Sequence, residues 1–177
     1  MKKKIKKKGI TIIEIIISMS IMLMVGSVIT VLSINNNKIL DRIDTLSELQ
    51  LHAQNIQAHL FNCILESEGV VDVEFDNEGN FLKSIVFKNE VFFHQYLVED
   101  GKLIYKLYEI NNEGKQELIQ TQTVSSLIQK IQVIPSSSQD LKTSNYIELN
   151  VSLEKKRGMD TLEYQLDNYI VFRNFKN

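Results

Sequence analysis

An apolar run of 25 residues near the N-terminus constrains this chain more than any other feature. Residues 10–34 read ITIIEIIISMSIMLMVGSVITVLSI and carry a single charge, Glu14. A helix of that length spans about 37 Å at about 1.5 Å per residue, which exceeds the roughly 30 Å hydrocarbon core of a bilayer. Six of the 20 basic residues precede the run in residues 1–9, MKKKIKKKG. Because flanking positive charge stays in the cytoplasm, we expect residues 35–177 to lie outside.

A secretory signal peptide is the main competing interpretation of this run. The apolar region of a signal peptide is about 7–15 residues long and ends at a cleavage site of small residues. The run in this chain is longer and has no clear exit of that kind. We therefore expect residues 10–34 to be retained as a single-pass anchor in the cytoplasmic membrane.

Glu14 is the one charged residue inside the apolar run. An unpaired carboxylate is costly in lipid, so an acid inside a membrane segment indicates a function or a nearby partner. One interpretation places Glu14 near the headgroups, where it reaches water or Lys8. The other interpretation comes from spacing, because a Lys-rich leader ends in Gly9 and the sequence ITIIE follows over residues 10–14.

This arrangement resembles the prepilin cleavage and methylation signal of type IV pilins and pseudopilins. That signal is a basic leader ending in Gly, a hydrophobic first mature residue, Thr or Ser, two aliphatic residues and a Glu in fifth place. Ile10 stands where the family usually has Phe, and the resemblance covers residues 1–34. It implies that a membrane prepilin peptidase cuts between Gly9 and Ile10, and that the new amine of Ile10 is a substrate for N-methylation.

The resemblance also implies a partner for Glu14. In the family, the fifth-position carboxylate pairs with the N-terminal amine of a neighbouring subunit, which here is the amine of Ile10. That amine is positively charged at neutral pH. Two charges that are costly alone in lipid offset one another, and the pair sets the register between subunits. The implied partners are other pilin subunits, the prepilin peptidase, the inner-membrane assembly platform and, before assembly, membrane lipid.

Loss of residues 1–9 would change the charge of the chain. The remaining 168 residues carry 14 Lys+Arg against 22 Asp+Glu, a net charge of −8 before the new amine is counted. Affinity for DNA rests largely on neutralisation of phosphates by Lys and Arg, so we predict no direct nucleic-acid binding. The single cysteine excludes an intrachain disulfide.

Residues 35–68 show the period of an amphipathic helix. Asn35, Asn36 and Asn37 mark the membrane exit, and no Pro or Gly occurs between residues 27 and 68. The simplest interpretation is one helix over about residues 11–66. Apolar residues recur at spacings of three and four along its outer half, at Leu46, Leu49, Ala53, Ile56, Leu60 and Cys63. Such an apolar stripe must be shielded from water, and we expect the downstream sheet to pack against it.

At Gly69 the hydrophobic period changes from that of a helix to that of strands. We predict strands at 71–75, 81–88, 91–98, 102–110, 116–124, 146–154 and 162–172, whereas residues 125–134 fit either a strand or a short helix. Asp100-Gly101 predicts a tight hairpin. The connections are too short for parallel crossovers, so the sheet should be antiparallel. The expected fold is α+β, a long N-terminal helix on an antiparallel β-meander, which the pilin resemblance also implies.

These expectations divide the chain into four parts. Residues 1–9 are a cleaved leader, 10–34 the transmembrane half of the long helix, 35–68 its external amphipathic half, and 69–177 an antiparallel β-sheet domain.

Motifs for catalysis or cofactor binding are missing. The sequence contains no GxSxG, GxxxxGK[ST], GxGxxG or HExxH. We therefore predict no enzymatic activity and no cofactor. His94 stands alone on a predicted strand, where a structural or exposed position is expected.

Two groups of side chains allow a metal-site interpretation. They are His52, His59, Cys63 and Glu66 on the outer helix, and Asp72, Glu74 and Asp76 on the first strand. The first group is better explained by a core cysteine flanked by surface histidines. The second lacks the spacing of an EF-hand loop and is better explained by a solvated acidic face. We predict no metal site.

The sequence thus predicts a structural subunit of a type IV pilus or a related pseudopilus, in the cytoplasmic membrane first and at the cell surface after assembly. A minor subunit is favoured because the ending YIVFRNFKN resembles the tails of some minor pilins. A competence pseudopilin serving DNA uptake is an alternative within the class. A type II secretion context fits less well, because the Lys/Ile/Asn-rich composition without a cysteine pair is typical of a single-membrane bacterium. The alternative of another class is an unprocessed, membrane-anchored extracellular binding domain, which keeps residues 1–9 and does not need Glu14.

Overall fold

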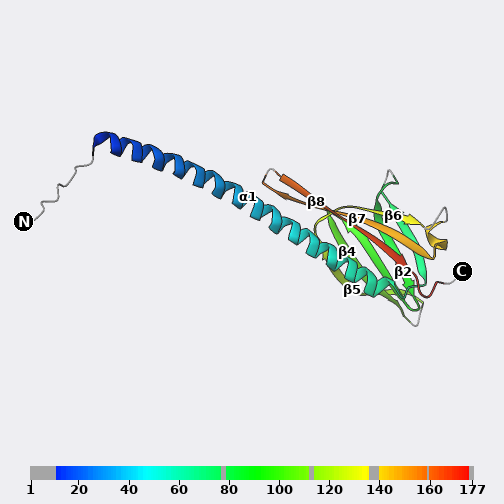
Figure 1. The fold of residues 1–177 in the computed structure, drawn as a ribbon. Coiled ribbons are helices and arrows are strands. Elements are labelled where there is room, and N and C mark those ends of the chain that lie inside the picture. The colour runs from blue at the N-terminus through cyan, green and yellow to red at the C-terminus, as the bar shows by residue number, and fades with distance from the viewer. Residues whose placement is uncertain (1–10, 77–78, 112–113, 136–139, 159, 176–177) are drawn as a thin grey trace, which may run out of the picture. The chain divides into compact units, whose positions relative to one another are not determined.

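The computed structural model describes residues 11–76, 79–111, 114–135, 140–158 and 160–175. One long helix is followed by strands and a short 3-10 helix (Figure 1). In chain order the elements are α1 (Ile12–Ile64), β1 (Gly69–Phe75), β2 (Leu82–Asn89), β3 (Phe92–Glu99), β4 (Lys102–Ile110), β5 (Gln116–Ser125), β6 (Ile128–Pro135), η1 (Leu141–Thr143), β7 (Tyr146–Arg157) and β8 (Asp160–Val171). Every strand pairing among them is antiparallel, so the predicted α+β fold is confirmed.

Helix α1 is close to the single helix that the sequence predicts. It continues through Asn35, Asn36 and Asn37 without a break, because asparagine lowers helix propensity by only a fraction of a kcal/mol per residue. Residues 12–34 of α1 are apolar on all sides apart from Glu14, and its second half is amphipathic. The described chain divides into two compact units, one ending at Ile43 and one comprising Asp44–Asn177.

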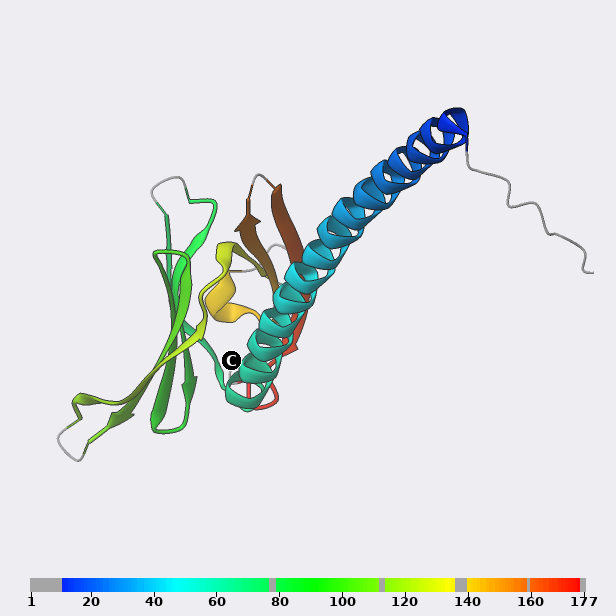
Figure 2. The ribbon, with the colours of Figure 1, turned by 90° about the vertical axis from the view of Figure 1, so that its left-hand side faces the viewer.

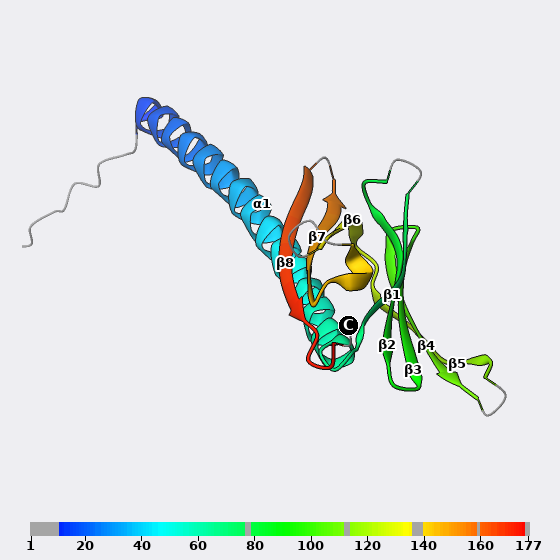
Figure 3. The ribbon, with the colours of Figure 1, turned by 90° about the vertical axis from the view of Figure 1, so that its right-hand side faces the viewer.

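The strands form two sheets, where the sequence had predicted one meander. The first sheet has the order β1-β2-β3-β4-β5 and the second the order β6-β7-β8. Figure 2 and Figure 3 show the two groups of strands as separate layers. The ambiguous segment 125–134 is resolved as the crossing between them: β5 ends the first sheet and β6 begins the second. Each sheet is itself a meander of neighbours in sequence.

The β3–β4 hairpin has the turn that Asp100-Gly101 predicts. Asp100 has φ 49° and Gly101 has φ 72°. Two successive left-handed residues define the type I′ turn, whose twist matches that of the flanking strands. The register places Glu99 opposite Lys102, which confirms a two-residue loop.

Side chains from the second half of α1 and from both sheets meet in one core. The helix contributes a stripe of buried residues at Leu49, Ala53, Ile56, Leu60 and Ile64. The first sheet adds residues such as Ile85 and Phe87, and the second adds residues such as Leu153 and Ile170. Every buried residue of the described chain lies between Thr45 and Phe172. Residues 44–177 therefore hold every buried residue of the described chain, and we expect them to fold without the apolar half of α1.

The C-terminal segment ties the end of α1 to the start of β1. The Arg173 N–H donates to the Leu65 carbonyl over 3.1 Å, and the Asn174 side-chain amide donates to the Glu66 carbonyl over 2.8 Å. Gly69 has φ 141°, and a Cβ built there would lie 3.4 Å from the Phe175 ring. The positive φ favours glycine at this position, and the Phe175 ring lies at an ordinary van der Waals distance from it.

Candidate functional site

The predicted processing site lies at the edge of the described chain. Gly9 and Ile10 are outside the described residues, so cleavage between them stays a prediction. The first described residues, Thr11 to Glu14, form the start of α1. The Thr11 N–H donates to Glu14 Oε2 over 2.8 Å, and the Thr11 hydroxyl lies 2.9 Å from the same oxygen.

Thr11 and Glu14 form a capping box. The Glu14 N–H points back to Thr11 Oγ1 at 3.4 Å, so each side chain bonds the backbone of the other residue. This arrangement satisfies backbone donors that the first turn of a helix leaves without intrahelical partners. Both bonds accepted by Glu14 end on Oε2, so Oε1 takes no part in the box. The carboxylate thus has a role within its own chain in addition to the one implied by the pilin resemblance.

The apolar half of α1 has no buried side chain. All residues from 11 to 43 are exposed in this chain, including residues such as Ile12 at 79% and Met22 at 78%. Isolated exposed apolar residues are ordinary, but a continuous apolar surface of this size marks a membrane or protein contact. Among the described residues, α1 is the one helix long and apolar enough to cross a membrane.

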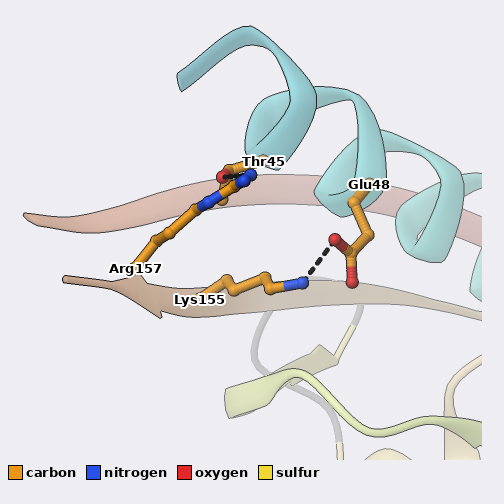
Figure 4. Close-up of polar contacts among 4 residues, drawn as sticks. All are labelled: Thr45, Glu48, Lys155 and Arg157. Atoms are coloured by element: carbon orange, nitrogen blue, oxygen red, sulfur yellow. Dashed lines mark hydrogen bonds and ion pairs between the residues drawn. The ribbon is translucent and has the colours of Figure 1, made fainter. Parts of the chain in front are cut away.

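Polar contacts join the second half of α1 to β7 (Figure 4). Lys155 forms an ion pair with Glu48, and Arg157 Nη1 lies 3.4 Å from Thr45 Oγ1. The Lys155 ammonium holds the pKa of the Glu48 carboxyl below its usual value. Lys155 and Arg157 alternate along β7 and therefore face the same side of the sheet. No local pattern predicts this contact, because Glu48 and Lys155 are 107 positions apart in the chain.

A cluster of buried polar rings joins α1 to β3 and β4. His59 Nδ1 lies 2.9 Å from the Tyr96 hydroxyl, and His94 Nδ1 lies 2.8 Å from the Tyr105 hydroxyl. The rings of His59 and Tyr105 are in edge contact, with centroids 4.6 Å apart. Burial lowers the pKa of both histidines, and for His94 the charge of His59 adds to the effect. Burial also raises the pKa of both tyrosines, which therefore remain protonated donors.

Cys63 belongs to the edge of this cluster. Its Sγ lies 3.8 Å from His59 Nδ1, one helical turn away. His94 Nε2 is buried and has no hydrogen-bond partner among the described residues. The sequence analysis placed His59 at the surface, which is wrong: the ring is half-buried, because Tyr96 and Tyr105 of the sheet cover it. Only the folding of β3 and β4 against α1 brings these groups together.

The structure separates the residues considered for metal binding. His52 Nδ1 lies 3.0 Å from the Ser125 hydroxyl, whereas His59 is bonded to Tyr96. On β1, Asp72 pairs with Lys142 of η1 at 3.4 Å, and Asp76 Oδ1 accepts the N–H of Asn80. Within the described part of the chain, no three His, Cys, Asp or Glu side chains are arranged to hold a metal ion.

Thr11 is the functional-site residue whose role the sequence analysis missed. The pattern Thr-x-x-Glu before an apolar run is itself a sequence signature of a capping box. Residues 11–14 therefore carry a local capping signal in addition to the prepilin-like pattern. Comparison with protein-family models, with curated proteins and with solved structures finds no match to this chain.

Proposed function

We propose that this chain is a minor pilin-like structural subunit of a type IV pilus or a related pseudopilus. The observation that carries the proposal is residues 12–34 of α1, which are apolar on all sides, exposed along their whole length and charged at Glu14 alone. Their partner must be as apolar as lipid and must accommodate one carboxylate. A bundle of identical helices with an amine near each Glu14 meets both requirements.

During assembly, the apolar half of α1 moves from lipid into contact with the helices of other subunits. Before assembly, the apolar half of α1 lies in the cytoplasmic membrane with the Lys-rich leader inside. Prepilin peptidase removes residues 1–9, and the assembly platform transfers the helix from lipid to its neighbours in the fibre. Packing between helices offers contacts that replace those with lipid tails. The amine of Ile10 in one subunit pairs with Glu14 of the next, and Oε1 is the oxygen left for it by the capping box.

Processing is tested by the intact mass and N-terminal sequence of the full chain isolated from membranes that contain its own peptidase. We expect a chain that begins at Ile10, with or without an added methyl group, and a full-length chain after Gly9→Leu. A wild-type chain that keeps its leader while the peptidase is active would contradict the proposal. That outcome would favour the unprocessed anchored binding domain.

The role of Glu14 in assembly needs a variant that separates charge from helix capping. Glutamine replaces glutamate in capping boxes, so Glu14→Gln keeps the cap and removes the charge. Glu14→Ala removes both. We expect both variants to be processed and both to be missing from sheared fibres, because each lacks the carboxylate that pairs with the amine.

Thr11→Ala is the matched control for the cap. It removes the Thr11 hydroxyl from the capping box and leaves the Glu14 charge in place. Loss of an N-cap side chain costs about 0.5–2 kcal/mol of helix stability. We expect Thr11→Ala to enter fibres at a reduced level. If Glu14→Gln assembles like wild type and Thr11→Ala does not, Glu14 acts as a cap and the charge-pair argument fails.

A further inference from the structure

Strand β5 presents an open backbone edge. It is the last strand of the first sheet and pairs with β4 alone. Residues 116–123 are exposed, and Leu118 and Ile119 are each 51% exposed. Among the described residues, no backbone group of β5 forms a hydrogen bond outside the ladder with β4. Alternate N–H and C=O groups along this edge therefore face solvent.

The other three sheet edges are covered or carry residues that oppose strand addition. Strand β1 contains Asp72 and Glu74 and has η1 beside it, where Lys142 pairs with Asp72. Strand β6 ends in Pro135. Strand β8 carries several acidic residues, among them Glu163 and Asp167. Charge, proline and covering segments are the usual means by which proteins protect sheet edges.

Charge and proline protect β5 little, and its remaining protection is two irregularities in its pairing with β4. Its sequence QELIQTQTVS contains one charge, Glu117, and no proline. Irregularities in its pairing with β4 leave a regular stretch from Gln120 to Thr123. Amide and hydroxyl side chains fill this stretch, and aliphatic side chains flank it. An uncharged, exposed strand of this kind is suited to pairing with another strand.

We propose that β5 pairs antiparallel with β5 of a second copy of this chain, centred on Thr121. Within the regular stretch, this register places Thr121 opposite Thr121 and Gln120 opposite Gln122, so hydroxyls meet hydroxyls and amides meet amides. The two Glu117 carboxylates do not face each other, because they lie at opposite ends of the paired strands. Cross-strand pairs of this type stabilise antiparallel sheets.

A contact between two strand edges is small by the standards of stable interfaces. Copies held in one membrane or one fibre have a high effective concentration, which favours a weak contact of this kind. The pairing does not depend on cleavage at Gly9 or on the charge of Glu14. Its failure and the failure of the proposed function can therefore be told apart.

Cysteine cross-linking in the full chain tests the register. Thr121→Cys places two thiols at the centre of the pair, where opposite Cα atoms of an antiparallel ladder are about 4.5–5.5 Å apart, within reach of a disulfide. Gln165→Cys on the exposed face of β8 is the matched control, and wild type reports the background from Cys63. We expect a disulfide-linked dimer in membranes for Thr121→Cys and little for the other two chains.

A charge on the edge tests the pairing itself. Residues 44–177 contain the whole core, so sedimentation equilibrium can be measured on them without the apolar half of α1. We expect the wild-type domain to self-associate, Thr121→Lys to weaken the association by roughly tenfold or more, and Gln165→Lys to leave it unchanged. Thr121 is exposed, so the substitution leaves the core intact. A wild-type domain that stays monomeric, together with no cross-link above the control, would overturn the proposal.

Discussion

The two halves of α1 are one continuous helix with opposite relations to their surroundings. From Ile12 to Ile43 no side chain is buried, whereas from Asp44 to Ile64 the stripe of Leu49, Ile56 and Ile64 is fully buried, at 0% exposure. Residues 12–34 are apolar on all sides apart from Glu14, whereas the second half is apolar on one side. A helix that is apolar all round requires an apolar environment on every side, and an amphipathic helix requires one covering layer.

Helix length alone therefore does not indicate the function of a helix. The backbone hydrogen bonds of both halves are satisfied internally, so the same secondary structure serves in lipid and in water. What separates the halves is the pattern of side chains around the axis.

Truncation of the buried stripe should destabilise the folded domain most. Ile56→Ala removes side-chain atoms from a fully buried position, and such changes cost about 2–5 kcal/mol. Leu51→Ala is the matched control on the same half of α1, because Leu51 is 56% exposed and should change the free energy of unfolding by less than about 0.5 kcal/mol. Urea denaturation of residues 44–177 measures both. Equal losses of unfolding free energy in the two variants would contradict the distinction between the buried stripe and the exposed face of α1.

A charge in the first half should affect membrane anchoring instead. Val25→Arg places a cation in the middle of the apolar half, where insertion scales give a cost of about 2.5–3.5 kcal/mol. We expect a reduced membrane-bound fraction of the full chain and no change in the unfolding of its folded domain. Val25→Leu should behave like wild type in membrane fractionation. Undiminished anchoring of Val25→Arg would show that residues 10–34 do not cross the bilayer.

Acidification should loosen the second half of α1 from the first sheet. The folded state lowers the pKa of His59 and His94, while in the unfolded chain a histidine titrates near pH 6.5. Below that pH the unfolded state binds more protons, so the stability of the domain falls as the pH decreases through about 6.5. Chemical denaturation at a series of pH values measures this slope.

Histidine substitutions identify the groups responsible for that slope. His94→Gln should reduce it, because one of the two buried imidazoles is gone. His52→Gln should retain it, because His52 is bonded to Ser125 outside the ring cluster. A slope that persists unchanged in His94→Gln would assign the acid sensitivity to other groups.

The ion pair between Glu48 on α1 and Lys155 on β7 should contribute least to the free energy of unfolding. Glu48 and Lys155 have side chains that are 43% and 29% exposed, and ion pairs with that much solvent contact contribute about 0.2–1 kcal/mol. A double-mutant cycle with Glu48→Gln and Lys155→Met measures the coupling. The pair of Asp72 and Lys142, which is more exposed, should give a smaller coupling. A larger coupling there would contradict the ranking by exposure.

Local patterns in the sequence were sufficient to predict most elements of the fold. The spacing of Leu49, Ala53 and Ile56 predicts the buried stripe of α1, and Asp100-Gly101 predicts the type I′ hairpin. Alternating side chains predict the strands within a few residues of their bounds. These signals are short-range, because helix period, strand period and turn chemistry depend on neighbours in the chain.

The division into two sheets depends on contacts that no local pattern contains. The sequence of residues 125–134 is compatible with a strand or a helix. In the structure most of these residues form β6, which pairs with β7. The ring cluster of His59, Tyr96, His94 and Tyr105 likewise requires α1 to meet the β3–β4 hairpin, and 37 positions separate His59 from Tyr96. Sequence spacing could list these residues but could not place them within bonding distance.

The apolar run of residues 10–34, the single charge within it and the amphipathic stripe that follows can all be read from the sequence, because each is a property of neighbouring residues. Tertiary structure alone decided that β5 remains an open edge while β1 is flanked by η1, and that Glu48 meets Lys155. The physical reason is that burial and pairing are settled by which surfaces meet after the chain folds back on itself. Composition and period are fixed before that happens.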